Sequence, residues 1–289
     1  MFVALKVAYH STYGTHHGWQ IQPNLRTIEG DVRRALLKSG LVCQTSVEKL
    51  TYAGRTDQGV NAIGQTVAVE LVGSSSTIPD RFLHRLNHYL PQNIRFWAFT
   101  AVPDSFHPRY QAVRRIYRYV WYNPSIKAVH VTRMRQAAHL LVGEHDFRNF
   151  SKNDDSKPTI ITKRSLDDIK LSFDQPGVLV VQLEAPSFLW QQCRRITSHL
   201  LEVGFAKADL ATTKALLEGD PKTRPLPMPP EHLTLVDVIY EGLCFVTDTS
   251  VLEKMMMVLN KELQERARLL HSLEGYSHSL SGEIDVFNP

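Results

Sequence analysis

The stretch RRIYRYVWYN, residues 114–123, is rich in aromatic and β-forming residues. Such residues favour strands, so we expect a long strand here, placed centrally in a sheet. Its arginines interleave with its tyrosines. Cations that meet phosphates, close to rings that stack on bases, are what single-stranded or looped RNA requires. An ordinary strand with half-buried tyrosines and snorkelling arginines would give the same pattern, so both interpretations stay open at this point.

Strand-like and helix-like segments alternate on both sides of this strand. Before it we expect strands around 3–9 and 67–71 and helices around 28–36 and 82–90. After it we expect helices around 134–141, 196–203 and 251–270 and strands around 169–173, 178–183 and 235–240. Thr27 is the expected N-cap of the first helix and Gly40 its stop. The order predicts an α+β fold whose second half repeats the architecture, though not the sequence, of the first.

The composition is that of a folded protein, with 43% hydrophobic and 21% charged residues among 289. No apolar run approaches the roughly 20 residues needed to span a bilayer, and residues 1–10 lack the features of a signal peptide. We therefore expect a cytoplasmic protein without membrane contact. The three cysteines are widely spaced and the histidines lack ligand spacing, which predicts no metal site. The net charge of +4 permits a polyanionic partner.

One irregular segment combines an arginine, a threonine and an aspartate between two glycines, in the order Gly54-Arg55-Thr56-Asp57-Gln58-Gly59. An aspartate beside a cation stays a carboxylate and can serve as a nucleophile or a base. Asp-x-Gly is also the sequence of a simple turn. The residues alone leave both interpretations open.

Residues 54–62, GRTDQGVNA, resemble the GRTDxGVHA motif of TruA-like tRNA pseudouridine synthases, whose aspartate is the catalytic residue. Asn61 stands where histidine is usual, which puts any role of that imidazole in doubt. Further similarities to this family follow in the family's order: Tyr9, Gly14, Gly18, Trp19 and Gln20; His107 to Tyr110; Arg115, Tyr117, Arg118 and Tyr119; and Phe188 to Gly204. Residues 145–152, HDFRNFSK, look closest to the archaeal and eukaryotic branches.

The resemblance implies the pseudouridine synthase fold. We then expect two ferredoxin-like α+β halves, residues 1–105 and 106–247, that form one long, mainly antiparallel sheet flanked by helices. A catalytic cleft would lie centrally, and residues 248–289 would add a C-terminal helix and tail. The partners implied are tRNA, bound through its anticodon arm, and a second copy of the chain in a homodimer. No cofactor is implied.

The resemblance also implies the site. Asp57 would be the catalytic nucleophile or base, Arg194 would pair with it through its two-pronged guanidinium, and Tyr117 would stack on the displaced base. The expected substrate contacts are Arg55, Thr56, Tyr119, Arg115, Leu189 and Gln20. The reaction implied is isomerisation of uridine to pseudouridine around positions 38–40 of tRNA. Two other classes of protein compete, an RNA-binding protein without activity and an unrelated hydrolase that uses Asp57.

Overall fold

The computed structural model describes residues 1–10, 15–73, 78, 81–123, 129–152, 161–219 and 224–287, with the side chains of 174 and 274–287 left aside. Gly14 of the family-like opening pattern lies outside these ranges. The chain divides into two compact units, Met1–Val246 and Thr247–Pro289. Among the described residues no helix is both long enough and apolar enough to cross a membrane.

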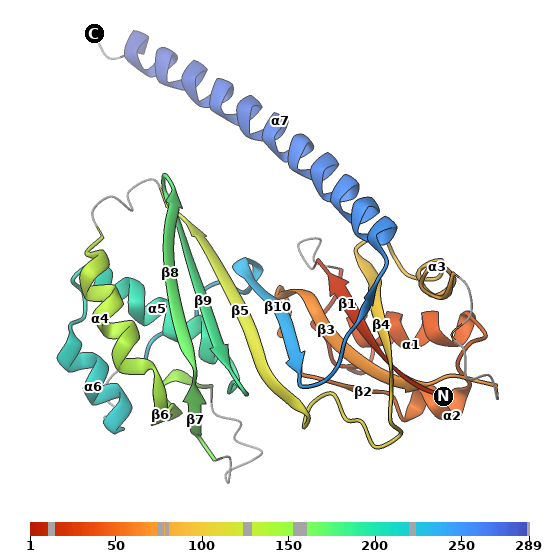
Figure 1. The fold of residues 1–289 in the computed structure, drawn as a ribbon. Helices are drawn as coiled ribbons and strands as arrows, with labels where there is room; N and C mark the ends of the chain where they lie inside the picture. Colours follow the sequence, from red (N-terminus) through yellow and green to blue (C-terminus); the bar gives the residue numbers. More distant parts are fainter. Residues whose placement is uncertain are drawn as a thin grey trace. The chain divides into compact units, whose positions relative to one another are not determined.

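A nine-stranded sheet forms the framework of the first unit, in the order β11-β4-β1-β3-β10-β5-β9-β8 with β2 beside β3 (Figure 1). The strands on one side are β11 (Val246–Thr247), β4 (Ile94–Val102), β1 (Phe2–Tyr9), β3 (Asn61–Glu70) and β2 (Thr51–Tyr52). Those on the other side are β10 (Leu233–Tyr240), β5 (Ala112–Tyr122), β9 (Val178–Ala185) and β8 (Asp168–Gln175). β5 is an interior strand, as its composition predicts.

The described neighbours in this sheet pair antiparallel wherever a register is recorded, except for β3 and β10. β10 pairs parallel with β3 through Thr234 and Leu235, and antiparallel with β5 on its other side. It therefore joins the strands of the two halves into one sheet. A small hairpin of β6 (Gly143–Asp146) and β7 (Lys163–Leu166) stands apart. The expected mainly antiparallel sheet is confirmed.

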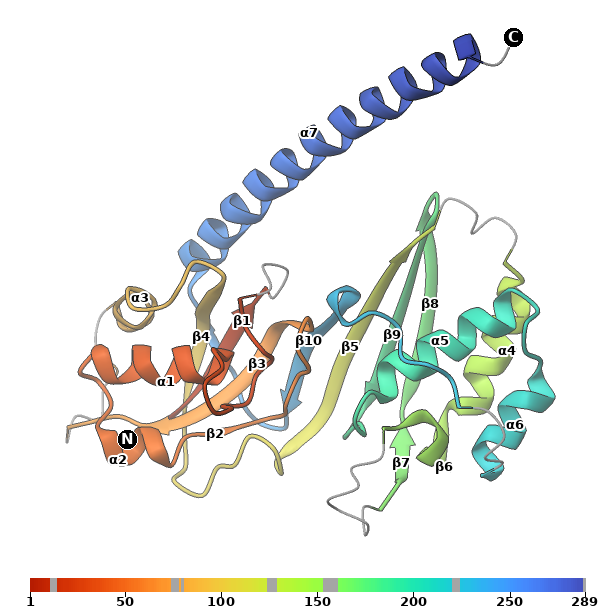
Figure 2. The same ribbon diagram turned by 180° about the vertical axis from the view of Figure 1, so that it is seen from behind.

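Helices cover one face of the sheet, which is turned forward in Figure 2. They are α1 (Ile28–Lys38) and α2 (Gln44–Glu48) over the first half, and α4 (Val131–Leu141), α5 (Gln192–Gly204) and α6 (Leu210–Glu218) over the second. α3 (Phe82–Asn87) lies beside β4. Thr27 caps α1 as predicted, because its side chain accepts a hydrogen bond from the Gly30 backbone N–H at 3.3 Å. α5 begins four residues earlier than expected, directly after Gln191.

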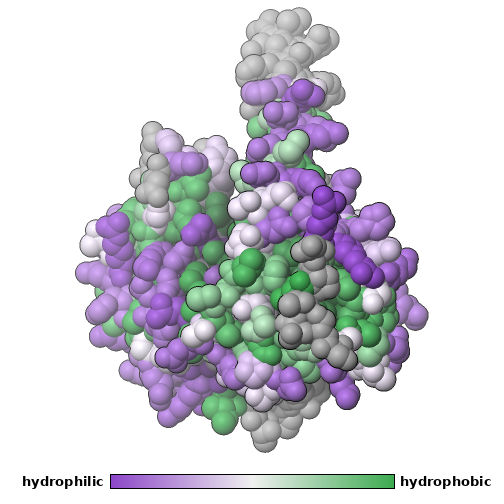
Figure 3. All heavy atoms as spheres, turned by 45° about the vertical axis from the view of Figure 1, so that its right-hand side comes forward, coloured by the Kyte–Doolittle hydropathy of each residue, from purple (hydrophilic) through white to green (hydrophobic). Residues whose placement is uncertain are grey.

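Two hydrophobic cores lie between the helices and the sheet. The first is centred on Leu5, Trp19 and Phe96, and the second on Tyr119, Phe147 and Leu200. Tyr117 packs against both cores and so marks their junction. On the face of the molecule in Figure 3, hydrophobic residues gather near the middle and hydrophilic residues surround them.

The second unit is essentially one helix, α7 (Thr249–Phe287). It continues well beyond the expected end near residue 270, through Gly275 and Gly282. A single glycine inside a helix costs about 1 kcal/mol relative to alanine but does not end it, which is why the terminus was misjudged from sequence.

Gly64 makes the junction of β3 and β10 possible. A Cβ atom there would lie 2.6 Å from the Asp237 Cα and 2.7 Å from the Val236 carbonyl oxygen, both backbone atoms that cannot move aside cheaply. The same Asp237 carboxylate receives the buried Lys6 ammonium at 2.6 Å. Burial lowers the pKa of Lys6, and the charge of Asp237 opposes that shift.

We expect Gly64→Ala to lower the free energy of unfolding by about 2–4 kcal/mol, because the added methyl displaces Asp237 and weakens its ion pair with the buried Lys6 ammonium. Urea unfolding followed by circular dichroism measures the change. An unfolding midpoint equal to that of the wild type would show that the strands can separate at no cost, contrary to this packing.

Candidate active site

The Asp57 loop connects β2 to β3, and backbone hydrogen bonds fix its first residue and the residue before Asp57. The Ala53 N–H donates to the Thr66 carbonyl at 2.9 Å, and the Thr56 carbonyl accepts from the Trp19 N–H at 3.1 Å. Thr56 is buried, and its hydroxyl lies 2.7 Å from that of Tyr9. Because Thr56 points inward, its neighbour Asp57 projects outward with 32% of its side chain exposed.

The Asp57 carboxylate meets two donors that are distant in sequence. Arg194 Nη1 lies 3.2 Å from Oδ2, and the Trp190 indole Nε1 donates to Oδ1 at 2.9 Å. Arg194 stands in the first turn of α5, and its Nε donates to the Met228 carbonyl at 2.5 Å. The structure thus brings Asp57 and Arg194 together, but at one point rather than two. The other carboxylate oxygen, Oδ1, accepts its hydrogen bond from Trp190.

Tyr117 projects from β5 toward this group and is half-buried. Its ring stands perpendicular to that of Phe188, with centroids 5.2 Å apart. Burial raises the pKa of Tyr117, and the nearby Cys193 thiol and Asp57 carboxylate raise it further while Arg115 opposes the shift. The phenol therefore keeps its proton at neutral pH. Among the described residues its hydroxyl has no hydrogen-bond partner.

Arg115 lies beneath the Asp57 loop rather than facing solvent. Its guanidinium donates to the carbonyls of Ala53 at 2.7 Å and Arg109 at 2.9 Å, and also to that of Pro186. Burial lowers the pKa of Arg115, but an arginine remains charged even so. With its donors directed at carbonyls, the side chain ties the loop to β5 and to the residue after β9.

Tyr119 is likewise turned inward. It is fully buried in the second core, and its hydroxyl donates to the Pro229 carbonyl at 3.0 Å. The sequence-based expectation that Tyr119 and Arg115 contact substrate therefore finds no exposed surface to support it in this structure. On a strand, alternate side chains face opposite sides, so both residues belong to the helix-covered face together with Tyr117.

The remaining expected contacts lie at the surface or near it. Arg55 is exposed and forms no hydrogen bond or ion pair with the described residues. Gln20 is exposed as well. Leu189 is half-buried against the second core, and its N–H donates to the Gln192 side-chain oxygen at 2.7 Å.

A pocket of about 380 Å³ opens beside the Asp57 carboxylate. Both halves of the sheet unit contribute to its lining, which consists of His17, Gln22, Leu25, Asp57, Gln58, Trp190, Gln191 and Arg194. The arrangement offers a carboxylate, a charged donor and an exposed aromatic ring at one opening. It suits a ligand with an electrophilic carbon and a flat ring.

Comparison with known proteins identifies the family. The sequence profile described as tRNA pseudouridine synthase matches residues 137–241. The chain is 37% identical to tRNA pseudouridine synthase A of Pyrococcus abyssi over 272 residues, which covers 93% of this chain and 94% of that protein. It is also 37% identical to the protein of the same name from Pyrococcus furiosus over 284 residues, 97% of each chain. The chain belongs to the tRNA pseudouridine synthase family.

The protein is accordingly an isomerase, and the resemblance of its motifs to this family is confirmed. A chain in the solved Cbf5-Nop10-Gar1 complex aligns with 69% of this synthase and 54% of its own length at 13% identity and a TM-score of 0.33, which is too distant to inform the site. The matched profile includes Trp190 and Arg194 but not Asp57, which lies in the part covered by the full-length relatives.

The sequence did not single out Trp190, His17 or Gln22 as pocket residues. Trp190 does belong to a pattern of interest, because it follows Phe188 and precedes two arginines. Nothing in that pattern predicts its contact with Asp57. His17 and Gln22 carried none, since their place in the pocket depends on how the segment from 15 to 27 folds back.

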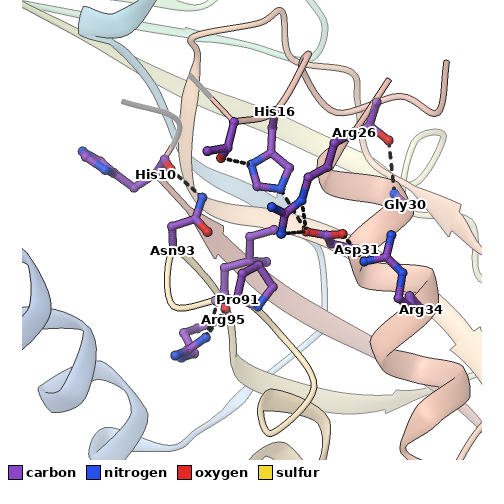
Figure 4. Close-up of polar contacts among 12 residues, drawn as sticks. His10, His16, Arg26, Gly30, Asp31, Arg34, Pro91, Asn93 and Arg95 are labelled. Carbon is purple, nitrogen blue, oxygen red and sulfur yellow. Dashed lines mark hydrogen bonds and ion pairs between the residues drawn. The ribbon is translucent and has the colours of Figure 1, made fainter. Parts of the chain in front are cut away.

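Asp31, at the start of α1, holds this pocket-wall segment in place (Figure 4). Its buried carboxylate accepts from His16 Nε2 at 3.0 Å, from Arg26 Nη2 at 2.7 Å and from Arg34 Nη1 at 2.6 Å. Burial alone would raise the pKa of Asp31. Hydrogen bonds from His16 and Arg26 and the charges of both arginines outweigh it and hold that pKa well below its usual range.

We expect the Asp31 network to make stability depend on acid. In the unfolded chain an aspartate titrates at about pH 3.9. The network therefore contributes its full stabilisation above that pH, and this stabilisation is lost as the pH falls toward the lower pKa of Asp31 in the folded protein. Asp31→Asn should lower the free energy of unfolding by about 1–3 kcal/mol at pH 7, and the difference should shrink below about pH 4. Urea unfolding between pH 2.5 and 7 measures it.

The exposed Asp104 provides the control, since Asp104→Asn removes one carboxylate without touching the network. A difference between wild type and Asp31→Asn that stayed constant down to pH 2.5 would contradict the ionised network.

Proposed function

We propose that this synthase converts uridine to pseudouridine in the anticodon arm of tRNA, around positions 38–40, with Asp57 as the catalytic carboxylate. The observation that carries the proposal is the position of Asp57. It is a half-buried carboxylate with 32% of its side chain exposed, paired with Arg194 at 3.2 Å, at the opening of a pocket that both halves of the sheet unit line.

The chemistry suits a carboxylate. The bond between C1′ of the ribose and N1 of the uracil must break, and a new bond forms between C1′ and C5. C5 gives up its proton and N1 gains one, so substrate and product are isomers and no electron carrier takes part. Asp57 either attacks C1′ or accepts a proton during departure of the base. Arg194 orients the carboxylate and balances its charge.

Tyr117 is proposed to lie against the detached base. Tyr117 does not line the pocket itself, but it packs at the junction of the two cores, close enough to Asp57 for that carboxylate to raise its pKa, and its protonated hydroxyl could donate a hydrogen bond to the base. A uridine in a stem must be extruded before it reaches this depth, at a cost of a few kcal/mol that stacking offsets. Arg55, which is exposed and has no ion-pair partner among the described residues, would contact a backbone phosphate beside the extruded nucleotide.

We also propose that the protein acts in the cytoplasm as a homodimer and without a metal or cofactor. Each half would supply part of the site, since residues 1–105 contain the Asp57 loop and residues 106–247 contain Arg194 and Tyr117. Arg115 and Tyr119, which face inward, would position the loop and the pocket wall rather than contact RNA.

Asp57→Asn tests the catalytic assignment, because the amide keeps the shape of the side chain and loses its charge. We expect pseudouridine formation in an unmodified tRNA transcript to fall by about 10³-fold or more, with tRNA affinity retained. Single-turnover conversion and filter binding measure the two quantities. Arg194→Lys should lower the rate less, and Arg195→Lys provides its control, because Arg195 donates to Gln191 and Pro225 instead. An active Asp57→Asn enzyme would refute the assignment.

The tRNA positions are tested by mapping. Carbodiimide adducts read by primer extension should appear at uridines 38–40 of a transcript treated with wild-type enzyme and at no other arm. Replacing those uridines with cytidines should abolish pseudouridine formation, because no uridine then remains at these positions to be isomerised. Modification confined to another arm would overturn the choice of substrate site while leaving the isomerase activity intact.

A further inference from the structure

The Asp57 carboxylate is held at both oxygens by one short segment of the chain, residues 190–194. Arg194 meets Oδ2 at 3.2 Å, and the Trp190 indole N–H meets Oδ1 at 2.9 Å. We propose that Trp190 is a positioning residue that fixes the plane of the Asp57 carboxylate for attack. The inference rests on the proposed function, because the orientation of Asp57 by Trp190 affects the reaction only if Asp57 performs the chemistry.

Two donors are needed because one leaves a rotation free. The final torsion of an aspartate side chain joins an sp³ to an sp² carbon and has a broad energy profile, so packing or hydrogen bonds must set it. Asp57 stands on a loop with 32% of its side chain exposed, so packing alone does not set it. A contact to Oδ2 defines a pivot, and a second contact to Oδ1 defines the plane. Each oxygen keeps a lone pair for the substrate.

Trp190 is itself held by polar contacts rather than by burial, since 44% of the residue is exposed. The Lys152 ammonium lies 4.3 Å from the centre of its ring, and the Lys152 N–H donates to the Trp190 carbonyl at 2.9 Å. A cation over an indole face is attracted by the negative charge density of the ring. The ring is therefore fixed from the side of Lys152 and its N–H is directed at Asp57.

The backbone next to Trp190 also serves this arrangement. Gln191 has a φ of 64°, in the left-handed region that a residue with a side chain rarely adopts. The turn it makes separates Trp190 from the first turn of α5, so that the indole and the Arg194 guanidinium reach the same carboxylate from two directions.

Trp190→Phe tests the inference, because it keeps an aromatic ring and removes the N–H. The matched control is Trp97→Phe, which removes a comparable indole hydrogen bond, from Nε1 to the Ile63 carbonyl at 2.7 Å, elsewhere in the same unit. Single-turnover conversion of uridine in a tRNA transcript gives the rate and half-saturating enzyme concentration. Filter binding gives the affinity.

We expect Trp190→Phe to lower the maximal rate by about 10- to 100-fold while the affinity changes by no more than about twofold, and Trp97→Phe to behave as wild type. Lys152→Gln, which leaves the N–H in place but loosens the ring, should lower the rate by a smaller factor. Circular dichroism and thermal unfolding confirm that each variant is folded.

Three results would overturn the inference. A loss confined to tRNA affinity would make Trp190 a stacking surface for RNA, and an unchanged or faster reaction would show that its N–H does not aid Asp57. An equal loss in Trp97→Phe would reduce both effects to general destabilisation. Asp57→Asn, assayed in parallel, distinguishes failure of the proposed function from failure of this inference. If Asp57→Asn is active, the proposed function fails. If Asp57→Asn is inactive and Trp190→Phe reacts normally, only the role of Trp190 is overturned.

Discussion

The pairing of β10 with β3 on one side and with β5 on the other is the constraint on which the site depends. Each half of the sheet unit packs its own hydrophobic core, and β10 contributes Leu235 to the first core and Leu233 to the second. Because β10 is fixed to both neighbours, the loop after β2 and the start of α5 face each other across the junction. Asp57 and Arg194, 137 residues apart, meet only for this reason.

Much of the polar chemistry around the junction serves to hold elements rather than to react. Arg115 donates to three backbone carbonyls, and Asp31 accepts hydrogen bonds from a histidine and two arginines. Lys6 forms an ion pair with Asp237 from the neighbouring half of the sheet. Buried charges of this kind are costly unless they are fully paired, so each fixes one arrangement of the segments it joins. The consequence is a frame of paired groups around a carboxylate that is itself only half-buried.

The arginines and tyrosines of the strand from 114 to 122 suggest one RNA-binding surface, but they lie on two faces of the sheet. Its arginines and tyrosines interleave along the chain, but a strand sends alternate residues to opposite faces. Arg115, Tyr117 and Tyr119 turn to the helix-covered side and become part of the frame. Arg114 lies on the other side, where Glu184 and Asp167 neutralise it at 3.3 and 3.5 Å. The residues of the pattern are therefore divided between two faces, with Arg114, Arg118 and Tyr122 exposed on the second, and the strand itself is central as expected.

From the sequence alone one could predict the α+β class, the central strand, the cap of α1 and the motif around Asp57, because local propensity, periodicity and short motifs are properties of neighbouring residues. The sequence could not show that Arg115 and Tyr119 point inward, that Trp190 contacts Asp57, or that His17 and Gln22 line the pocket. Those facts depend on which face of a strand meets a core and on where a loop returns, and contacts between residues more than a hundred positions apart set both. Local pattern therefore determined the elements and singled out Asp57 as the candidate residue, whereas only tertiary packing decided what surrounds it.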